Sequence, residues 1–480
     1  MPPKHICDAF LNAFTTFIYP IVPLIDLPSF QSWYSVFWKW CNRSFPSDNI
    51  PPALLEDVTV LSLLFALLYA GASVAPESSW SSQPLKDLTK GFILRGRKED
   101  YKTILLACAH QSHPTLSTIT AELLVDPFTR NLDSLANGLF ISSIARLAQS
   151  VGLHRDDDCS SSPSQSTKHL RQRVWSHIIW LDVQYSVVKG LPPGIACPGN
   201  RPARLPNPIP VIKLGVDHAS FARDVLLHDR DERAHLAHMF LSHIHGMGDL
   251  SESKYRELVA QAKDSYRVSS SAADDIPLHR EHATAFTRWA GHLVILTQLE
   301  LLIFIHGPLL RLPGPSEGTQ GKSQNESVWT RLTRLCIRYL RIYISATSKP
   351  ESQSYAWFFS RTAGPVYCFY LLLMCLRYCP ASNTAGIARM CVRDVFVHWE
   401  SSQEHGVGGL MGYTASREKL KVFWEGFPAH GQEVTSGDPV AFAEPVERSA
   451  GNLTEKQNFE LDLDFIDEVF DWSGWWLSFR

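Results

Sequence analysis

The sequence has few closely spaced cysteines and little net charge. Its ten cysteines are scattered without a Cys-x-x-Cys pair, whereas a zinc site built from thiolates needs several cysteines close together. Several of them lie in apolar segments, which is typical of reduced thiols that fill the core of an intracellular protein. The formal net charge of −3 gives no general attraction to nucleic-acid phosphates, and no basic arm is present.

The sequence also lacks the sustained alternation of polar and apolar residues that is typical of strands. We therefore predict an all-α chain, and 45% hydrophobic residues are enough to bury a large core. The N-terminus lacks the pattern of a signal peptide. Residues 58–75 carry no charge over the length of a short membrane helix, but Thr59, Ser62 and Ser73 interrupt them and no Lys or Arg cluster anchors either end. We predict a buried helix there, with a membrane-associated protein as the alternative.

Residues 139–195 carry the clearest helical pattern and predict a helical hairpin. In the first arm, apolar residues recur at three- and four-residue steps, which places them on one stripe of a helix: Leu139, Ile141, Ile144, Leu147, Ala148 and Val151. Gly152 then favours a left-handed helix end. After a polar loop over residues 157–168, a second arm repeats the pattern: Val174, Trp175, Ile178, Leu181, Tyr185 and Val188. Gly190, Pro192 and Pro193 end it.

The same residues carry a resemblance to a known family. The segment Ile144-Ala-Arg-Leu-Ala-Gln-Ser-Val-Gly-Leu-His-Arg-Asp156, followed by Arg171-x-Arg-Val-Trp175 and Gly190-x-Pro-Pro193, resembles the core signature of the fungal-specific transcription factor domain. Weaker similarity extends from about Tyr19 to about Cys379. Leu191 departs from the pattern, because the family usually carries Arg there. The signature residues are Arg146, Gly152, Leu153, His154, Arg155, Arg171, Arg173, Trp175, Asp182, Gly190, Pro192 and Pro193.

The resemblance implies a large helical regulatory domain that works in the nucleus and needs no cofactor. Its expected partners are DNA-bound transcription factors or coactivators, in a homodimer or a heterodimer, and many relatives control specialised-metabolite gene sets. In most members a binuclear zinc cluster with six cysteines precedes this domain, whereas only Cys7 and Cys41 precede residue 100 here. Direct DNA binding is therefore not expected. The open explanations are a regulator without its own DNA reader, a coding sequence that lacks its first exon, and an inactive truncated member.

The predicted organisation is a helical domain over residues 1–436 and a flexible tail over residues 437–480. Apolar spacing predicts helices at 105–124, broken at His113-Pro114, and at 283–306 and 363–376. Five prolines favour an extended segment at 196–210. The Gly, Pro, Ser and Gln content of residues 313–327 predicts a mobile linker.

The tail contains a strongly acidic segment. Residues 460–471 hold six acidic side chains and no Lys or Arg, with apolar residues between them. Like charges keep such a chain extended and leave its apolar groups available to a partner, which is typical of an acidic activation segment. We predict one at 460–476, or alternatively a final helix packed on the body. The expected contact residues are Phe465, Ile466, Val469, Phe470, Trp472, Trp475 and Trp476.

Three features could indicate chemistry instead. His235 and His238, with His243 nearby, could share a helix face in a metal site or a helical enzyme, but no carboxylates or thiols at matching spacing complete the set, so we predict neither metal nor catalysis. Residues 314–318 fit Gly-x-Ser-x-Gly, yet no strand precedes the serine. Asp182 interrupts an apolar helix face. We predict that it pairs with Arg146 or His154, with a ligand-sensing role as the alternative.

Overall fold

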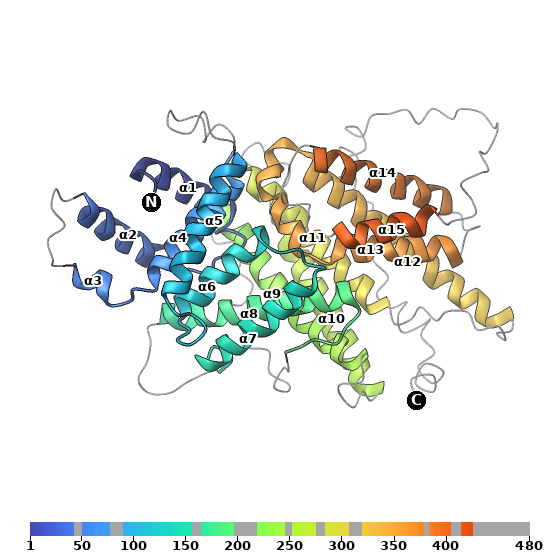
Figure 1. The fold of residues 1–480 in the computed structure, drawn as a ribbon. Coiled ribbons are helices and arrows are strands. Elements are labelled where there is room, and N and C mark those ends of the chain that lie inside the picture. The colour runs from blue at the N-terminus through green and yellow to red at the C-terminus, as the bar shows by residue number, and fades with distance from the viewer. Residues whose placement is uncertain are drawn as a thin grey trace.

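The computed structural model describes residues 1–42, 50–76, 90–155, 165–195, 218–244, 252–274, 284–306, 319–378, 384–404 and 414–425. Every regular element in these ranges is a helix, which confirms the all-α prediction (Figure 1). The helices are α1 (Lys4–Phe17), α2 (Leu27–Cys41), α3 (Pro52–Leu55), α4 (Val60–Val74), α5 (Lys90–Ala107), α6 (Leu116–Val125), η3 (Asp126–Phe128), α7 (Leu135–Ser150), α8 (Gln165–Lys189), α9 (His218–Ile244), α10 (Glu252–Asp274), α11 (Ala285–His306), α12 (Thr319–Ser348), η5 (Pro350–Arg361), α13 (Gly364–Tyr378), α14 (Ala385–Glu404) and α15 (Thr414–Glu425), where η marks a 3-10 helix.

Helix α4 is the core of the N-terminal part and packs between α1 and α6. Leu64, Leu67 and Leu68 are fully buried, so the apolar run at 58–75 is an internal helix, as the sequence predicted. The helices α1 and α4 approach closely at Gly71. A Cβ atom at this position would lie 2.0 Å from the carbonyl oxygen of Phe10, so the approach requires glycine.

Within the described ranges, no helix is by itself both long enough and apolar enough to span a membrane. Helices η5 and α13, which meet at 72°, reach the necessary length and apolar composition only when taken together.

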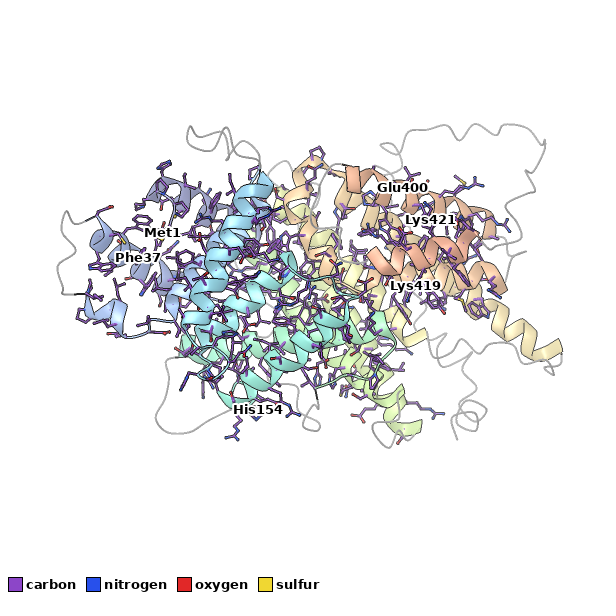
Figure 2. All side chains as sticks on the ribbon, viewed as in Figure 1. Met1, Phe37, His154, Glu400, Lys419 and Lys421 are labelled. Carbon is purple, nitrogen blue, oxygen red and sulfur yellow. The ribbon has the colours of Figure 1, made fainter. Side chains whose placement is uncertain are left out.

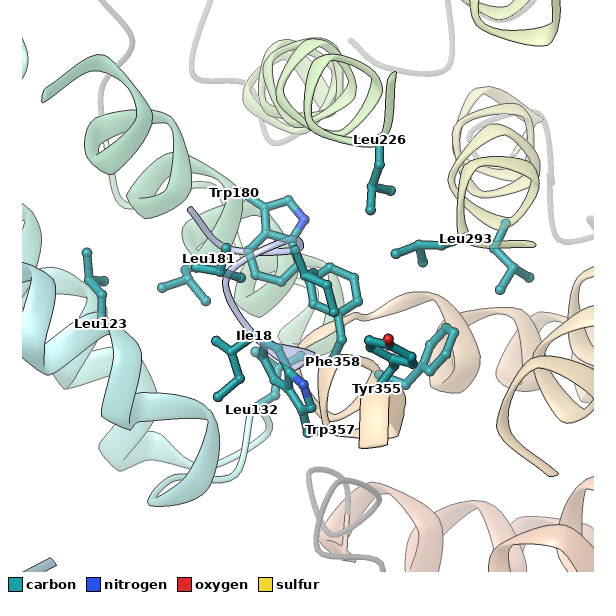
Figure 3. Packing of buried hydrophobic residues seen from close by; sticks show 14 of the residues in the cluster. Ile18, Leu123, Leu132, Trp180, Leu181, Leu226, Leu293, Tyr355, Trp357 and Phe358 are labelled. Carbon is teal, nitrogen blue, oxygen red and sulfur yellow. The ribbon is translucent and has the colours of Figure 1, made fainter. Parts of the chain in front are cut away.

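Aromatic side chains of η5 are buried in the hydrophobic core (Figure 3). Phe358 stacks on Trp180 of α8 with ring centroids 5.3 Å apart, and Tyr355 stacks on Trp289 of α11 at 5.2 Å. Trp357 contacts Phe128 of η3 at 5.6 Å. This 3-10 helix therefore joins the N-terminal helices to the C-terminal ones.

The C-terminal helices α12 to α15 form a bundle at the opposite end from α1 to α3 (Figure 1). Helix α12 packs on α11, α13 and α14. Cys336, Cys368, Cys375 and Cys391 are buried in this bundle and form no disulfide. These four therefore fill the core as the sequence predicted, whereas Cys41 of α2 is exposed.

Several predicted boundaries are confirmed and two are wrong. α6 begins at Leu116, directly after the break predicted at His113-Pro114, and α11 and α13 match the two predicted central helices. The helix predicted from 105 to that break is wrong over residues 108–113, because α5 ends at Ala107 and turns follow it. The predicted linker at 313–327 is too long, because α12 begins at Thr319. Gln, Lys and Glu in that stretch are good helix formers, and they outweigh its Gly and Ser content. The rest of that linker, the extended segment at 196–210 and the tail at 437–480 lie outside the described residues.

Candidate functional site

The predicted hairpin is present as α7 and α8, which pack against each other. On α7 the inward residues Ile141, Ile144 and Ala148 are buried, and Val174 and Ile178 of α8 are buried in the same core. The placement of Leu139 on this stripe was wrong, because its side chain is 65% exposed. A residue two positions before Ile141 lies about 200° away around a helix, so it faces solvent.

The corner of the hairpin is held by Gly152 and by an arginine from the second arm. Gly152 takes the predicted left-handed conformation, with φ +73°, and the Leu153 N–H donates to the Ala148 carbonyl at 2.9 Å. Arg171 Nη2 donates to the Val151 carbonyl at 2.9 Å. This guanidinium therefore binds a helix carbonyl that would otherwise lack a donor, and it ties the start of α8 to the end of α7.

Other signature residues of the two arms divide into inward and outward groups. Arg173 Nη1 donates to the Pro23 carbonyl at 3.3 Å, which ties the hairpin to the segment after α1. The His154 ring lies 6.0 Å from the Trp175 ring. Arg146 and Arg155 are exposed, and the Arg146 guanidinium donates only to Gln149 of its own helix, at 3.1 Å. Arg146 and Arg155 are therefore surface groups, whereas Arg171 and Arg173 donate hydrogen bonds to backbone carbonyls.

Asp182 has different partners from those predicted. Its Oδ1 accepts from the Gly194 N–H at 3.1 Å and its Oδ2 from the Ile195 N–H at 3.0 Å, so the predicted pairing with Arg146 or His154 is wrong. The reason is the reversal at Gly190, with φ +62°, after which the chain folds back along the last turns of α8. Burial raises the pKa of Asp182, and the two backbone donors partly offset this shift.

The turn over residues 190–195 is held from a second side by α9. The His238 Nε2 lies 2.7 Å from the Ile195 carbonyl oxygen, to which it donates, and the His238 side chain is buried. Asp182 and His238 thus bind the two backbone polar groups of one residue, the N–H and the C=O of Ile195. The histidine-rich stretch therefore contributes a structural contact that its spacing did not reveal.

The histidine stretch is not arranged as a metal site where the structure describes it. No group of three His, Cys, Asp or Glu side chains among the described residues could hold a metal ion. Burial lowers the pKa of His235, and His238 adds to this shift. The His243 side chain and residues 314–318 lie outside the described residues.

Sequence reasoning missed a buried ionic cluster around Arg361. The guanidinium of this η5 residue donates to the Asp126 carboxylate, to Asn137 Oδ1 at 2.8 Å and to the Arg130 carbonyl at 3.1 Å. Arg361 is 1% exposed and Asp126 0%. Burial raises the pKa of Asp126, and the two nearby arginines work in the opposite direction. The cluster joins η3, α7 and η5, and no spacing in the sequence indicates it.

A small cavity adjoins this cluster. His177, Trp180, Phe358 and Arg361 are among the residues that line it. It has room for about one water molecule, so it is too small for a metabolite. Burial lowers the pKa of His177, and nearby arginines lower it further. The cavity is therefore a packing feature beside Arg361.

Comparisons with known proteins agree with the signature in the hairpin. Residues 11–210 match the family described as fungal specific transcription factor domain. The chain is 32% identical to transcription factor macR of Penicillium terrestre over 444 residues, 83% of this chain and 50% of that protein. It is 31% identical to transcription factor yanR of Aspergillus niger, over 83% of this chain and 44% of the relative.

A more distant relative is cutinase transcription factor 1 alpha of Fusarium vanettenii, 25% identical over 40% of this chain and 19% of that protein. This chain thus spans about half the length of the two more similar relatives. No solved structure matches it.

Proposed function

Residues 11–210 of this chain are a fungal specific transcription factor domain, and from this premise we propose that the chain regulates transcription of a fungal gene set in the nucleus. We propose that the regulated genes form a specialised-metabolite gene cluster, because the resemblance in the sequence implies such a role. The observation that carries it is the agreement between the hairpin signature and the two relatives named as transcription factors.

The chemistry of the described residues supports a role in contact rather than catalysis. Asp182, His238 and Arg361 are of residue types that serve in catalytic sites, yet each is buried and bound to backbone or to an ion partner. A general acid or base must reach its substrate, and these side chains are engaged inside the body. The alternative of a helical enzyme at His235, His238 and His243 gains no support from this arrangement.

The body acts through protein partners in this proposal. The net charge of −3 does not favour duplex DNA. We propose that a DNA-bound transcription factor, in a homodimeric or heterodimeric assembly, brings the chain to its genes. The acidic segment 460–476 would then contact a coactivator through its apolar side chains.

A reporter assay tests the activation role. Residues 437–480 are fused to an unrelated DNA-binding domain, and we expect reporter output well above that of the DNA-binding domain alone. Replacing Phe465, Phe470 and Trp472 by Ala should abolish the gain, because the acidic groups hold these rings available to the coactivator. A matched triple in the same tail, Phe442→Ala, Val446→Ala and Leu453→Ala, should leave the output unchanged. Output equal to the bare DNA-binding domain would remove the activation role and favour a packed terminal helix.

A further inference from the structure

Helix α14 exposes a row of apolar side chains on the side that faces away from the body. Ile387, Met390 and Val397 are 46%, 59% and 65% exposed. The opposite side packs on α12 and α13, and Cys391 and Val395 on that side are fully buried. Helix α14 lies along the edge of the C-terminal bundle (Figure 1). The exposed row is therefore open to a partner.

The spacing of this row is that of a coiled-coil seam. Ile387 and Asp394 stand seven residues apart, and so do Met390 and Val397, which alternate with them at steps of three and four. These are the a and d positions of a heptad repeat, which share one stripe of a helix. We call Ile387, Met390, Asp394 and Val397 the α14 seam. A surface helix normally turns its apolar stripe toward its own core, whereas the α14 seam is a second stripe on the other side.

Opposite charges lie within the α14 seam and next to it. Asp394 occupies an a position, Arg393 directly precedes it at the edge of the seam, and both side chains are exposed. Among the residues that the structure describes, neither takes part in an ion pair. Covering the Asp394 carboxylate without a cation would cost free energy. The partner must therefore bring a cation to Asp394 and an anion to Arg393.

A second copy of α14 meets both requirements when the two helices run parallel. A two-fold axis along a parallel pair sets each edge of the seam against the opposite edge of the other copy. Arg393 of each copy then lies beside Asp394 of the other, so the ion pair is made twice. Met390 and Val397 meet their own counterparts about one turn to either side. The surface is therefore complementary to itself in both charge and apolar groups.

An antiparallel pair does not satisfy the same charges. Two-fold symmetry then sets each edge of the seam against the same edge of the other copy, so Asp394 faces the edge that carries Ile387 and Asp394. Arg393 could reach Glu400 of the second copy, but Lys421 already lies 3.6 Å from that carboxylate (Figure 2). Asp394 would still lack a cation. The charges therefore favour the parallel pair.

We propose that the α14 seam binds the α14 seam of a second copy of this chain in a parallel pair. This inference rests on the proposed function only in that it names a second copy as one partner of the assembly. The contact itself is measured without any transcriptional readout. The seam contains only two heptads and is a small interface, so we expect a dimer that forms as the chain is concentrated.

Disulfide trapping in the full chain tests the contact and its direction. Met390→Cys and Val397→Cys are made separately and oxidised by oxygen with a copper–phenanthroline catalyst, so that two thiols give up two protons and two electrons. In a parallel pair each new cysteine meets its counterpart, and mass spectrometry should find symmetric 390–390 and 397–397 links. Leu139→Cys on α7 is the matched control, because Leu139 is as exposed as Val397, and it should give no symmetric link.

A mixture of the two cysteine variants separates the two directions. Symmetric links in the mixture support the parallel pair. Links found only between positions 390 and 397 indicate an antiparallel pair and overturn the proposal. A yield no higher than that of the Leu139→Cys control also overturns it.

Sedimentation equilibrium of charge variants tests the two ion pairs. Asp394→Arg should weaken association severalfold, because two arginines then meet at each site. The exchange Arg393→Asp with Asp394→Arg should restore association, because opposite charges meet again. Circular dichroism confirms that each variant is folded. Equal association constants in the parent and in Asp394→Arg would overturn the proposal.

The tail fusion described above reports activation independently of this contact. A full chain that stays monomeric at every concentration, with an active tail, removes this inference alone and leaves the proposed function standing. A dimer through the α14 seam with an inactive tail keeps the contact and removes the activation role.

Discussion

Different interactions stabilise the hairpin region and the C-terminal bundle. Around α7 and α8, charged side chains bind backbone: Arg171 reaches the Val151 carbonyl, and Asp182 binds the N–H groups of Gly194 and Ile195. In the bundle, Cys336, Cys368 and other apolar side chains fill the interior, and the arginines of α12 point outward. The first region is therefore sensitive to single polar changes, whereas the second is sensitive to volume.

The largest effect is expected at the cluster that joins the N-terminal helices to η5. Arg361→Met should lower the free energy of unfolding by about 3–5 kcal/mol, because it leaves the Asp126 carboxylate buried without its main partner. Urea unfolding measures this. Arg341→Met on the exposed face of α12 is the matched control, and it should stay within about 0.5 kcal/mol of the parent.

Removing both partners of that cluster sharpens the comparison. Arg361→Met combined with Asp126→Leu should recover much of the loss, because no uncompensated buried charge remains. A single Arg361→Met variant as stable as the parent would show that the cluster does not hold the two parts together.

A buried carboxyl in α11 should make stability depend on pH. Burial raises the pKa of Glu300 from 4.5 to about 7, although Arg233 opposes the shift. The folded state then holds this proton more tightly than the unfolded chain, so its contribution falls as pH rises from about 4.5 and is lost above about 7. Glu300→Gln should remove this slope and stabilise the protein at pH 8 by up to about 3 kcal/mol. Identical slopes in thermal melts of parent and variant between pH 4.5 and 8 would contradict the assignment.

Close packing of α1 on α4 gives the next effect. Gly71→Ala should lower the free energy of unfolding by about 1–3 kcal/mol, because the added Cβ meets the Phe10 carbonyl oxygen and backbone must move. Gly96→Ala in α5 is the control, since no atom lies within 4 Å of its Cβ position, and it should stabilise by about 0.5–1 kcal/mol. Equal effects of the two changes in chemical unfolding would argue against the close approach.

The smallest expected effect separates the observed role of Asp182 from the predicted one. Asp182→Ala leaves the N–H groups of Gly194 and Ile195 without their acceptor and should cost about 1–2 kcal/mol. Arg146→Ala should change stability by less than about 0.5 kcal/mol, because its guanidinium is exposed. Thermal melts measure the stability of both variants. Equal losses of stability in Asp182→Ala and Arg146→Ala would support the predicted pairing of Asp182 with Arg146.

Much of the fold follows from local patterns in the sequence. Apolar runs predicted α4, α11 and α13, the left-handed conformation at Gly152 followed from glycine at a helix end, and α8 ends directly before Gly190 as predicted. Periodicity alone misplaced Leu139, because a pattern of apolar residues does not say which one starts the buried stripe. Local patterns thus predict where a helix lies better than they predict which face of that helix is buried.

Contacts between residues that are far apart in the chain could not be predicted from the sequence. Arg361 and Asp126 are 235 positions apart, and no spacing rule links them. The partners of Asp182 depended on how the chain turns after Gly190, which sets the backbone of residues 194 and 195 against α8. A buried carboxylate predicts that a donor exists, but the tertiary fold decides which donor it is.

The central claim, that this chain regulates transcription, is tested most directly by sequencing the RNA of its source organism with and without the chain. The account predicts that a defined set of genes changes in expression, and that a chain with Phe465, Phe470 and Trp472 replaced by Ala fails to restore it while the parent chain succeeds. An unchanged transcriptome under conditions in which the chain is produced would contradict the account.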